Sequence, residues 1–343
     1  MLKILLDAMG GDNAPQATVQ GAVDALKADK GISLVLTGRK AEIEAELAKY
    51  KYDKARIEII DCEQVIDMND IPTEAVRTKR NSSMVEGFWQ LKKNDDIAAL
   101  VTAGSTGAAI VGGQIIVGRI PKIKRAALCP AIPNSRGKMT LLCDCGANAE
   151  CKPSMLCQFA VLGSAYAAAA FGAENPKVGL LSNGTEEHKG DPLHREVYSY
   201  LSKMPAIDFV GNVEGRDIML GECDVVVSDG FSGNIALKSL EGCGKMILNT
   251  LKAEFKSSLS SMIGYLFAKG AIKRMRAKLD FDKVGGALLL GLKKPVIKSH
   301  GSSKPTTICN SILNAATICR GKLIDRVQNT LAKIDFTELI PDE

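Results

Sequence analysis

Short apolar runs alternate with longer segments of helical periodicity along most of this chain of 343 residues. Eight of the runs predict buried strands, at residues 3–6, 33–37, 56–60, 98–102, 140–143, 177–181, 208–210 and 224–227. The segments between them predict helices, including 14–28, 42–49, 84–93, 155–170 and 193–204. Such alternation favours right-handed βαβ crossovers. We therefore expect a Rossmann-like α/β fold of three α/β/α layers, in which a mostly parallel sheet is covered by helices on both faces.

The composition is that of a folded, soluble protein rather than a disordered or nucleic-acid-binding chain. Hydrophobic residues make up 46% and charged residues 24%, which excludes wholesale disorder. A formal net charge of +5 with 5% aromatic residues disfavours a nucleic-acid partner but suits anionic ligands. No repeat or low-complexity linker divides the chain, so we expect a single domain over residues 1–343.

The ten cysteines do not predict a metal site. Their densest group, within residues 143–157, contains no Cys-x-x-Cys pair, and structural zinc sites usually have such pairs. We expect reduced core thiols and, without a signal peptide at residues 1–7, a cytoplasmic chain. Two uncharged stretches, 97–118 and 153–173, have the length of a membrane span. Their glycines and alanines instead favour a strand–turn–helix unit and a buried helix.

Residues 250–282 break the alternation and predict an inserted, basic amphipathic helical hairpin that protrudes from the fold. Residues 255–279 contain six Lys and Arg residues and no acidic residue. The apolar members at helical spacing include Leu259, Ile263, Leu266 and Phe267. A membrane surface or an acidic protein would attract such a hairpin. Alternatively, its apolar face packs against the body or a second subunit.

Glycine-rich loops follow several predicted strands, at the edge where doubly wound sheets bind ligands. The first loop contains Asp7, Gly10, Gly11 and Asp12. The glycines let a ligand approach the backbone, whereas the two carboxylates would repel phosphate unless they orient donors or a lysine. The alternative is a tight turn in which Asp12 or Asn13 caps the next helix.

The second loop, residues 102–107, joins a predicted strand to a helix. It offers backbone N–H groups and two hydroxyls, from Gly104, Ser105 and Thr106, which predict an anion nest. The chain has neither a Walker A loop nor a G-x-G-x-x-G run after a strand, so nicotinamide binding is poorly supported.

Two later loops place cations and amides near predicted strand ends. Residues 182–191 carry Lys189, whose positive charge could stabilise a phosphate or a developing oxyanion. The alternative is that Lys189 belongs to an exposed charged loop. Residues 228–238 carry Asp229, Asn234 and Lys238 at the start of a helix.

The remaining candidates are histidines and hydroxyls. Residues 299–303 supply His300 and Ser302, although a lone histidine is more often structural, and we assign no role to His188 or His194. The chain has no G-x-S-x-G elbow and no Cys/His pair in a nucleophile context. Several phosphate-sized donor loops without a covalent nucleophile suggest that phosphate itself is a substrate.

The run at residues 7–15 resembles the opening signature of the PlsX family, the bacterial phosphate acyltransferases of phospholipid synthesis. The resemblance continues in order through residues 102–108, 144–148, 186–190, 211–217, 229–234 and 300–303. Ser105 and Ser182 stand where the family often has asparagine, Thr185 where it often has glutamate, and residues 304–307 also depart from its pattern. These swaps keep small polar groups, so they bear on individual contacts rather than on the activity.

The resemblance implies that acyl-[acyl carrier protein] and orthophosphate give acyl phosphate and free carrier protein. A membrane acyltransferase would then use the acyl phosphate to acylate glycerol 3-phosphate. The family's fold is related to those of phosphotransacetylases and isopropylmalate-type dehydrogenases. Its members are homodimers without a required cofactor and lie peripherally on the cytoplasmic face of the cell membrane.

Carried over residue by residue, the resemblance gives Lys189 and Asn234 catalytic roles as charge-stabilising groups. The implied phosphate-binding residues are Asp7, Gly10, Gly11, Asp12, Gly104, Ser105, Thr106, Asn148, Asp229, Lys238, His300 and Ser302. The apolar stripe of the predicted hairpin, with Leu259, Ile263, Leu266 and Phe267, is the expected membrane contact. The acidic carrier would dock on Lys122, Lys124 and Arg125 or on residues 269–278. The alternatives are a short-chain phosphotransacetylase acting on acyl-CoA and a non-catalytic membrane scaffold.

Overall fold

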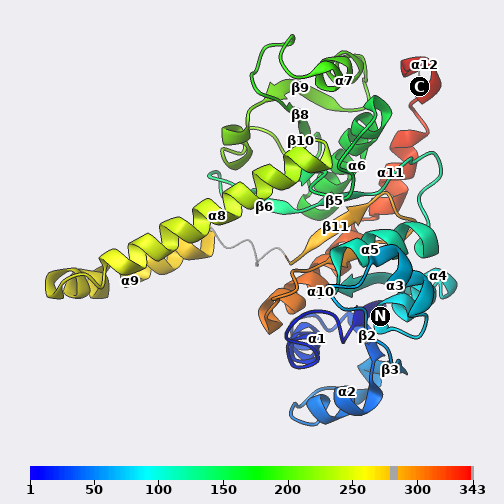
Figure 1. The fold of residues 1–343 in the computed structure, drawn as a ribbon, viewed down its shortest axis with the longest axis vertical. Helices are drawn as coiled ribbons and strands as arrows, with labels where there is room; N and C mark the ends of the chain where they lie inside the picture. Colours follow the sequence, from blue (N-terminus) through cyan, green and yellow to red (C-terminus); the bar gives the residue numbers. More distant parts are fainter. Residues whose placement is uncertain (279–284, 341–343) are drawn as a thin grey trace.

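The strands of the chain form two sheets, and the computed structural model describes residues 1–278 and 285–340 (Figure 1). The first sheet has seven strands in the order β3 (Ile57–Asp61), β2 (Ile32–Gly38), β1 (Leu2–Asp7), β4 (Ile97–Thr102), β12 (Val296–Lys298), β11 (Ala287–Leu290) and β5 (Ala127–Cys129). The second has five, in the order β6 (Ala131–Pro133), β7 (Met139–Cys143), β10 (Val225–Val227), β8 (Lys177–Leu181) and β9 (Asp208–Val213). Among the named strands of the described residues, only β11 with its two neighbours and β6 with β7 pair antiparallel. The predicted α/β fold with mostly parallel strands is confirmed, and all eight predicted strands are present.

Helices cover both faces of the first sheet. Because successive strand residues point to opposite faces, Ile4 and Leu6 share one apolar cluster and Leu5 belongs to another. The cluster of Ile4 and Leu6 includes α1 (Gln16–Ala28) and α10 (Pro305–Arg320), whereas that of Leu5 includes α3 (Pro72–Thr78), α4 (Ser83–Lys93) and α5 (Thr106–Gly112). Burial on both faces explains why continuous apolar runs, rather than alternating ones, mark these strands in the sequence.

The helix α6 (Pro153–Phe171) is the core element shared by the two halves. It packs on β7, β8 and β10 and against α7 (Pro192–Ser202), α10 and α11 (Leu323–Leu331). Among the described residues it is the one helix long and apolar enough to cross a membrane, and 72% of its apolar window is buried inside the fold. This burial agrees with the core helix expected from the alanine-rich stretch.

The smaller elements complete the chain. Residues 97–118 form the expected strand, turn and helix, because α5 follows β4 and continues into the π-helical segment η2 (Gly113–Val117). The others are α2 (Lys40–Leu47), η1 (Lys54–Arg56), η3 (Gly215–Met219) and α12 (Phe336–Leu339).

The chain changes sheets at Pro130, which separates β5 from β6. Proline has no backbone N–H to donate to a continuous ladder. The sheets remain joined because the Leu128 N–H donates to the Asp144 carboxylate at 2.8 Å, and the Leu128 carbonyl accepts from the Cys145 N–H at 2.9 Å. The sequence analysis expected one sheet, since strands of three residues are too short to show periodicity.

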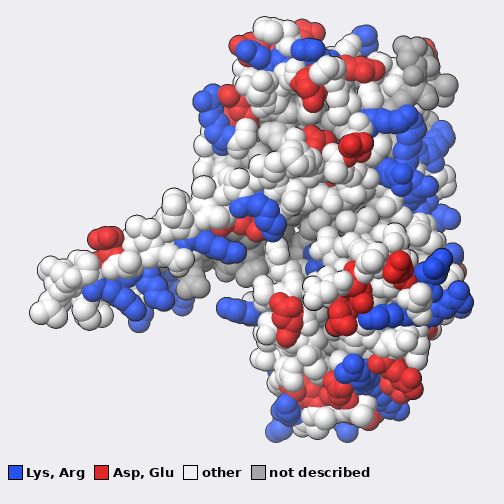
Figure 2. Space-filling view, in the orientation of Figure 1, with Lys and Arg blue, Asp and Glu red and all other residues white. Residues whose placement is uncertain are grey.

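The helices α8 (Gly230–Glu254) and α9 (Leu259–Lys278) form a hairpin that projects from the body, as expected (Figure 1). Its first helix begins well before the predicted residue 250, at Gly230 in one of the candidate loops. Figure 2 shows Lys and Arg side chains gathered along one side of the hairpin. Residues 279–282 of the predicted hairpin lie outside the described residues.

Two glycines of α8 differ sharply in the space around them. A Cβ on Gly233 would lie 1.9 Å from the Asp144 carbonyl oxygen, whereas a Cβ on Gly242 would meet nothing within 4 Å. The absence of a side chain at Gly233 therefore lets α8 approach the loop after β7.

We predict that Gly233→Ala lowers the free energy of unfolding by about 3 kcal/mol or more, since backbone must shift to admit the methyl group. Gly242→Ala on the same helix should instead raise it by up to about 1 kcal/mol, because alanine is the better helix former. Urea denaturation of the two variants checks both values. Equal effects of the two substitutions would contradict the close approach of α8 to Asp144.

Candidate functional site

The loops that follow β1, β4 and β12 meet at one edge of the first sheet, because these strands are parallel neighbours. The Asp12 N–H donates to the Gly301 carbonyl at 2.8 Å, and the Asn13 side chain donates to the Ser303 carbonyl at 3.1 Å. A Cβ on Gly11 would lie 2.8 Å from the Gly301 carbonyl oxygen. The structure therefore brings together candidates from three distant segments: Gly10, Gly11, Asp12, Gly104, Ser105, Thr106, His300 and Ser302.

Asp7 lies buried beneath these loops. Its carboxylate accepts from the Thr102 hydroxyl at 2.7 Å and from the Met9 N–H at 3.3 Å. Burial raises the pKa of Asp7, against hydrogen bonds from Ser83 and Thr102 and the charge of Lys298. The sequence analysis required a donor or a lysine beside this carboxylate, and the structure supplies both.

The first loop does not end in the helix cap that was considered as its alternative role. Neither Asp12 nor Asn13 caps α1: Pro15 occupies the N-cap position, without a side-chain cap. Ser105 does cap α5, accepting from the Ala108 N–H at 3.4 Å, and Thr106 is exposed in the first turn. The Asp12 carboxylate is therefore not committed to a helix cap.

Lys298 is a further candidate site residue, which the sequence pattern did not single out. Its side chain is buried and its ammonium donates to the carbonyls of Ala103, at 3.4 Å, and Ser299. Burial lowers the pKa of Lys298 from its ordinary 10.5 to about 8, although the charges of Asp7 and Asp12 oppose this. A lysine ending the apolar strand 296–298 is the signal that could have identified it.

A second group of candidates lies at the carboxyl ends of β7, β8 and β10. The Asp144 carboxylate accepts from the Asn148 N–H at 2.8 Å and from the Asn148 side-chain nitrogen at 2.9 Å. The same nitrogen donates to the Ala126 carbonyl at 2.8 Å, so the fold itself uses the amide of Asn148. Burial raises the pKa of Asp144, and these hydrogen bonds oppose the shift.

The first turns of α8 carry three of the predicted residues. Asp229 caps the helix, accepting from the Ser232 N–H at 2.8 Å. Asn234 is exposed and faces the loop after β7, where a Cβ on Gly146 would lie 3.7 Å from its amide carbon. Lys238 is exposed one turn further along.

Lys189 lies in the loop after β8, which is the neighbour of β10. Its aliphatic stem passes Gly184, where a Cβ would lie 2.8 Å from the Lys189 Cγ. Within residues 1–278 and 285–340, no hydrogen bond or ion pair holds its ammonium, and none joins it to Asn234. The lysine itself is half-buried.

His194 also has a position that the sequence analysis did not anticipate. It is buried, with Nδ1 2.7 Å from the Asp191 carboxylate and Nε2 3.8 Å from that of Asp229. His194 therefore connects the loop of Lys189 to the start of α8. His188, by contrast, is exposed.

Glu241 connects the two groups of loops. Its carboxylate accepts from the Lys238 ammonium at 2.9 Å and lies 3.6 Å from the Nε2 atom of His300. Lys238 belongs to α8, whereas His300 follows β12 in the first sheet. The candidate site therefore spans both sheets. The sequence did not reveal Glu241 as a candidate, because helical spacing alone does not show that α8 reaches His300.

In the described part of the chain, no group of three or more His, Cys, Asp or Glu side chains could hold a metal ion. All ten cysteines are free thiols and most are buried. The burial of most of these side chains agrees with the expectation that they are core residues.

The lowered pKa of Lys298 predicts a pH-dependent effect of Lys298→Met. Below pH 8 the Lys298 ammonium is charged in the folded wild type, and burying this charge is costly. Between pH 8 and 10.5 Lys298 is neutral in the folded state but still charged in the unfolded chain. The wild type should therefore gain about 3 kcal/mol relative to the variant over that range. Urea denaturation of both proteins from pH 7 to 10.5 measures this difference. A constant difference would contradict the burial of a charged Lys298.

The family model described as "Fatty acid synthesis protein" matches residues 2–326. The chain is 41% identical to the phosphate acyltransferase of Clostridioides difficile (strain 630), over 97% of each chain. It is 44% identical to that of Brevibacillus brevis, over 97% of this chain and 98% of the relative. A phosphotransacetylase from Streptococcus pyogenes has a similar fold, with a TM-score of 0.59 and 20% identity over 94% of both chains.

Proposed function

The chain belongs to the fatty acid synthesis protein family, which here includes phosphate acyltransferases, and we propose that it makes acyl phosphate from acyl-[acyl carrier protein] and orthophosphate. Its class is that of an acyltransferase of fatty acid and phospholipid synthesis. Acyl phosphate from this reaction would supply a membrane enzyme that acylates glycerol 3-phosphate.

One observation carries the proposal: Glu241 and His300 link the candidate residues of the two sheets, and in the loop after β8 the Lys189 ammonium has no ion-pair partner among the described residues. Backbone N–H groups at glycine loops bind phosphate oxygens, and a free ammonium can balance the added charge. Cys145 lies near Lys238 and Glu241, but its thiol is a poor nucleophile because burial raises the pKa of this thiol well above its ordinary value. These features support direct attack by phosphate rather than an acyl-enzyme.

In the proposed reaction, a phosphate oxygen held by the loops attacks the thioester carbonyl. A new C–O bond forms, the carbonyl oxygen takes the negative charge, and the C–S bond then breaks to release the carrier as a thiolate. Lys189 and the Asn234 amide would donate hydrogen bonds to the developing oxyanion and to phosphate. Glu241 would orient Lys238 and His300, its two neighbours from opposite halves of the site.

The test is a phosphate-dependent assay with palmitoyl-[acyl carrier protein], in which acyl phosphate is trapped as the hydroxamate. We expect hydroxamate only when both orthophosphate and the carrier thioester are present. Reaction with short acyl-CoA alone would favour a phosphotransacetylase, and no reaction with either donor would favour a membrane scaffold.

In the same assay, Lys189→Ala should lower kcat by about 10²–10³, as expected when one oxyanion donor is lost. Lys203→Ala, at the C-terminal end of α7, is the control for loss of a lysine elsewhere in the same half of the molecule. Wild-type turnover by a folded Lys189→Ala protein would remove Lys189 from the mechanism.

The hairpin is the proposed membrane contact, which would place the protein peripherally on the cytoplasmic face. Its apolar side chains are exposed, including Leu266 at 70% and Phe267 at 87%, together with Leu259 and Ile263. Lysines such as Lys269 and Lys273 lie on the same helix and would attract anionic lipid. Docking of acyl carrier protein is proposed for the exposed Lys122, Lys124 and Arg125 or for residues 269–278.

Leu266→Glu should abolish flotation with anionic phospholipid vesicles, because it places a charge on the apolar surface that enters the lipid. Leu220→Glu, an exposed leucine outside the hairpin, is the matched control. Light scattering of both variants measures the expected homodimer. A Leu266→Glu protein that loses its dimer but keeps vesicle binding would assign the surface to the second subunit instead.

A further inference from the structure

The connection between β3 and α3, residues 62–71, lies against the candidate site, and we refer to it as the strap. A Cβ on Gly301 would lie 2.8 Å from the terminal methyl carbon of Met68, so Met68 in the strap contacts the loop that also accepts from Asp12. At its end, the strap leads into Pro72, whose ring lies 2.5 Å from the position of a Cβ on Gly107 in α5. The strap therefore contacts the loop after β12, and the first residue of α3 that follows it contacts the first turn of α5.

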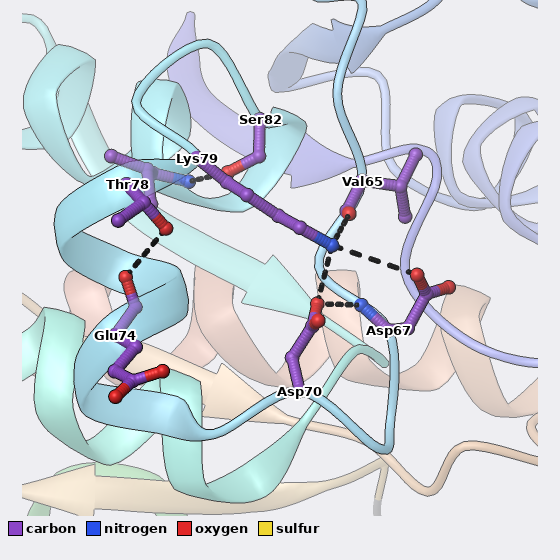
Figure 3. Close-up of polar contacts among 8 residues, drawn as sticks. Val65, Asp67, Asp70, Glu74, Thr78, Lys79 and Ser82 are labelled. Atoms are coloured by element: carbon purple, nitrogen blue, oxygen red, sulfur yellow. Dashed lines mark hydrogen bonds and ion pairs between the residues drawn. The ribbon is translucent and has the colours of Figure 1, made fainter.

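One lysine holds the strap in this position (Figure 3). The Lys79 ammonium, at the end of α3, donates to the Val65 carbonyl at 3.0 Å and to the Asp70 carboxylate at 2.5 Å, and lies 3.6 Å from that of Asp67. The Asp70 carboxylate also accepts from the Asp67 N–H at 2.8 Å, which closes the turn around Met68. The hydrogen bond to Asp70 raises the pKa of Lys79 and lowers that of Asp70.

The base of the strap is tied to the same segment as Lys79. The Gln64 N–H donates to the Asn81 carbonyl at 3.1 Å, and the Ser83 N–H donates to the Gln64 carbonyl at 3.2 Å. The hydroxyl of Ser83 in turn bonds to Asp7 beneath the glycine loops. Lys79 thus holds the part of the strap from Val65 to Asp70, and the backbone of Gln64 at its start is held by the segment that contacts Asp7.

The strap presents apolar side chains at the edge of the loops. Met68 and Ile71 are both exposed, although polar residues surround them in the strap. An acyl thioester beside bound phosphate can also react with water: the water oxygen forms the C–O bond, the C–S bond breaks, and the leaving carrier sulfur takes up the proton that the water loses. An apolar wall next to the loops would exclude this water.

We infer that Lys79 is a positioning residue of the acyl transfer, which holds Met68 against Gly301 and thereby favours phosphate over water as the acyl acceptor. The inference rests on the proposed function. A purely structural Lys79 would alter stability and kcat without altering which acceptor is used.

The experiment measures two products from palmitoyl-[acyl carrier protein] and orthophosphate: acyl phosphate and free fatty acid. Lys79→Met should lower the ratio of acyl phosphate to fatty acid at least about tenfold, since small displacements of positioning groups carry large costs. Lys79→Arg should restore most of the ratio. Lys3→Met is the matched control. Lys3, at the start of β1, is about as exposed as Lys79 and also forms an ion pair, at 2.6 Å from the Asp96 carboxylate.

Met68→Ala leaves the Lys79 contacts in place and should lower the ratio in the same way, which keeps the test valid if Lys79→Met does not fold. Unchanged ratios in folded Lys79→Met or Met68→Ala would overturn the inference while leaving the proposed function intact. A wild type that forms no acyl phosphate would overturn the proposed function itself, and the inference with it.

Discussion

The fold depends on the buried carboxylate of Asp144. It accepts hydrogen bonds from Leu128 in the first sheet and from Asn148 and Ala147 in its own loop. A buried carboxylate without partners is costly, so the two sheets have to keep the arrangement that supplies these donors. Since α8 also packs its Gly233 against the Asp144 carbonyl, the same residue lies against the first turns of the helix that carries Asn234 and Lys238. The candidate site lies between two sheets because this junction holds them together.

Charge is distributed unevenly over the site. Beneath the loops of the first sheet, Lys298 lies close to Asp7 and Asp12. Its ammonium donates to two backbone carbonyls of these loops, so it helps to hold the loops in position. At the second sheet, Lys189 has no such partners among the described residues. Lys238 lies between these extremes, paired with Glu241 but exposed. In the proposed reaction, phosphate would therefore meet Lys189, which is unpaired among the described residues, and Lys238, which can exchange its partner.

The sequence predicted the strands well because burial on both faces of a parallel sheet leaves long apolar runs, such as residues 98–102. It could not predict the division into two sheets, since β5, β6, β11 and β12 have only three or four residues each. The glycine loops after β1, β4 and β12 do lie together at one sheet edge, because glycine is needed where backbones approach. Lys298, His194 and Glu241 were missed because their roles depend on strand order and on a helix start that local spacing does not reveal. Asn148 was identified, but its amide is occupied by Asp144 and Ala126.

The continuous helix α8 has a mechanical consequence. Its 25 residues extend roughly 37 Å at 1.5 Å per residue, from the capping Asp229 to the far end of the hairpin. The helix is thus a spacer of fixed length between the loop edge and the hairpin tip. Because each residue also turns the helix by about 100°, one added residue in its exposed middle would rotate the tip by more than a quarter turn yet lengthen the spacer by only about 1.5 Å. The direction that the tip faces is therefore determined by the number of residues in α8, independently of the contacts at either end.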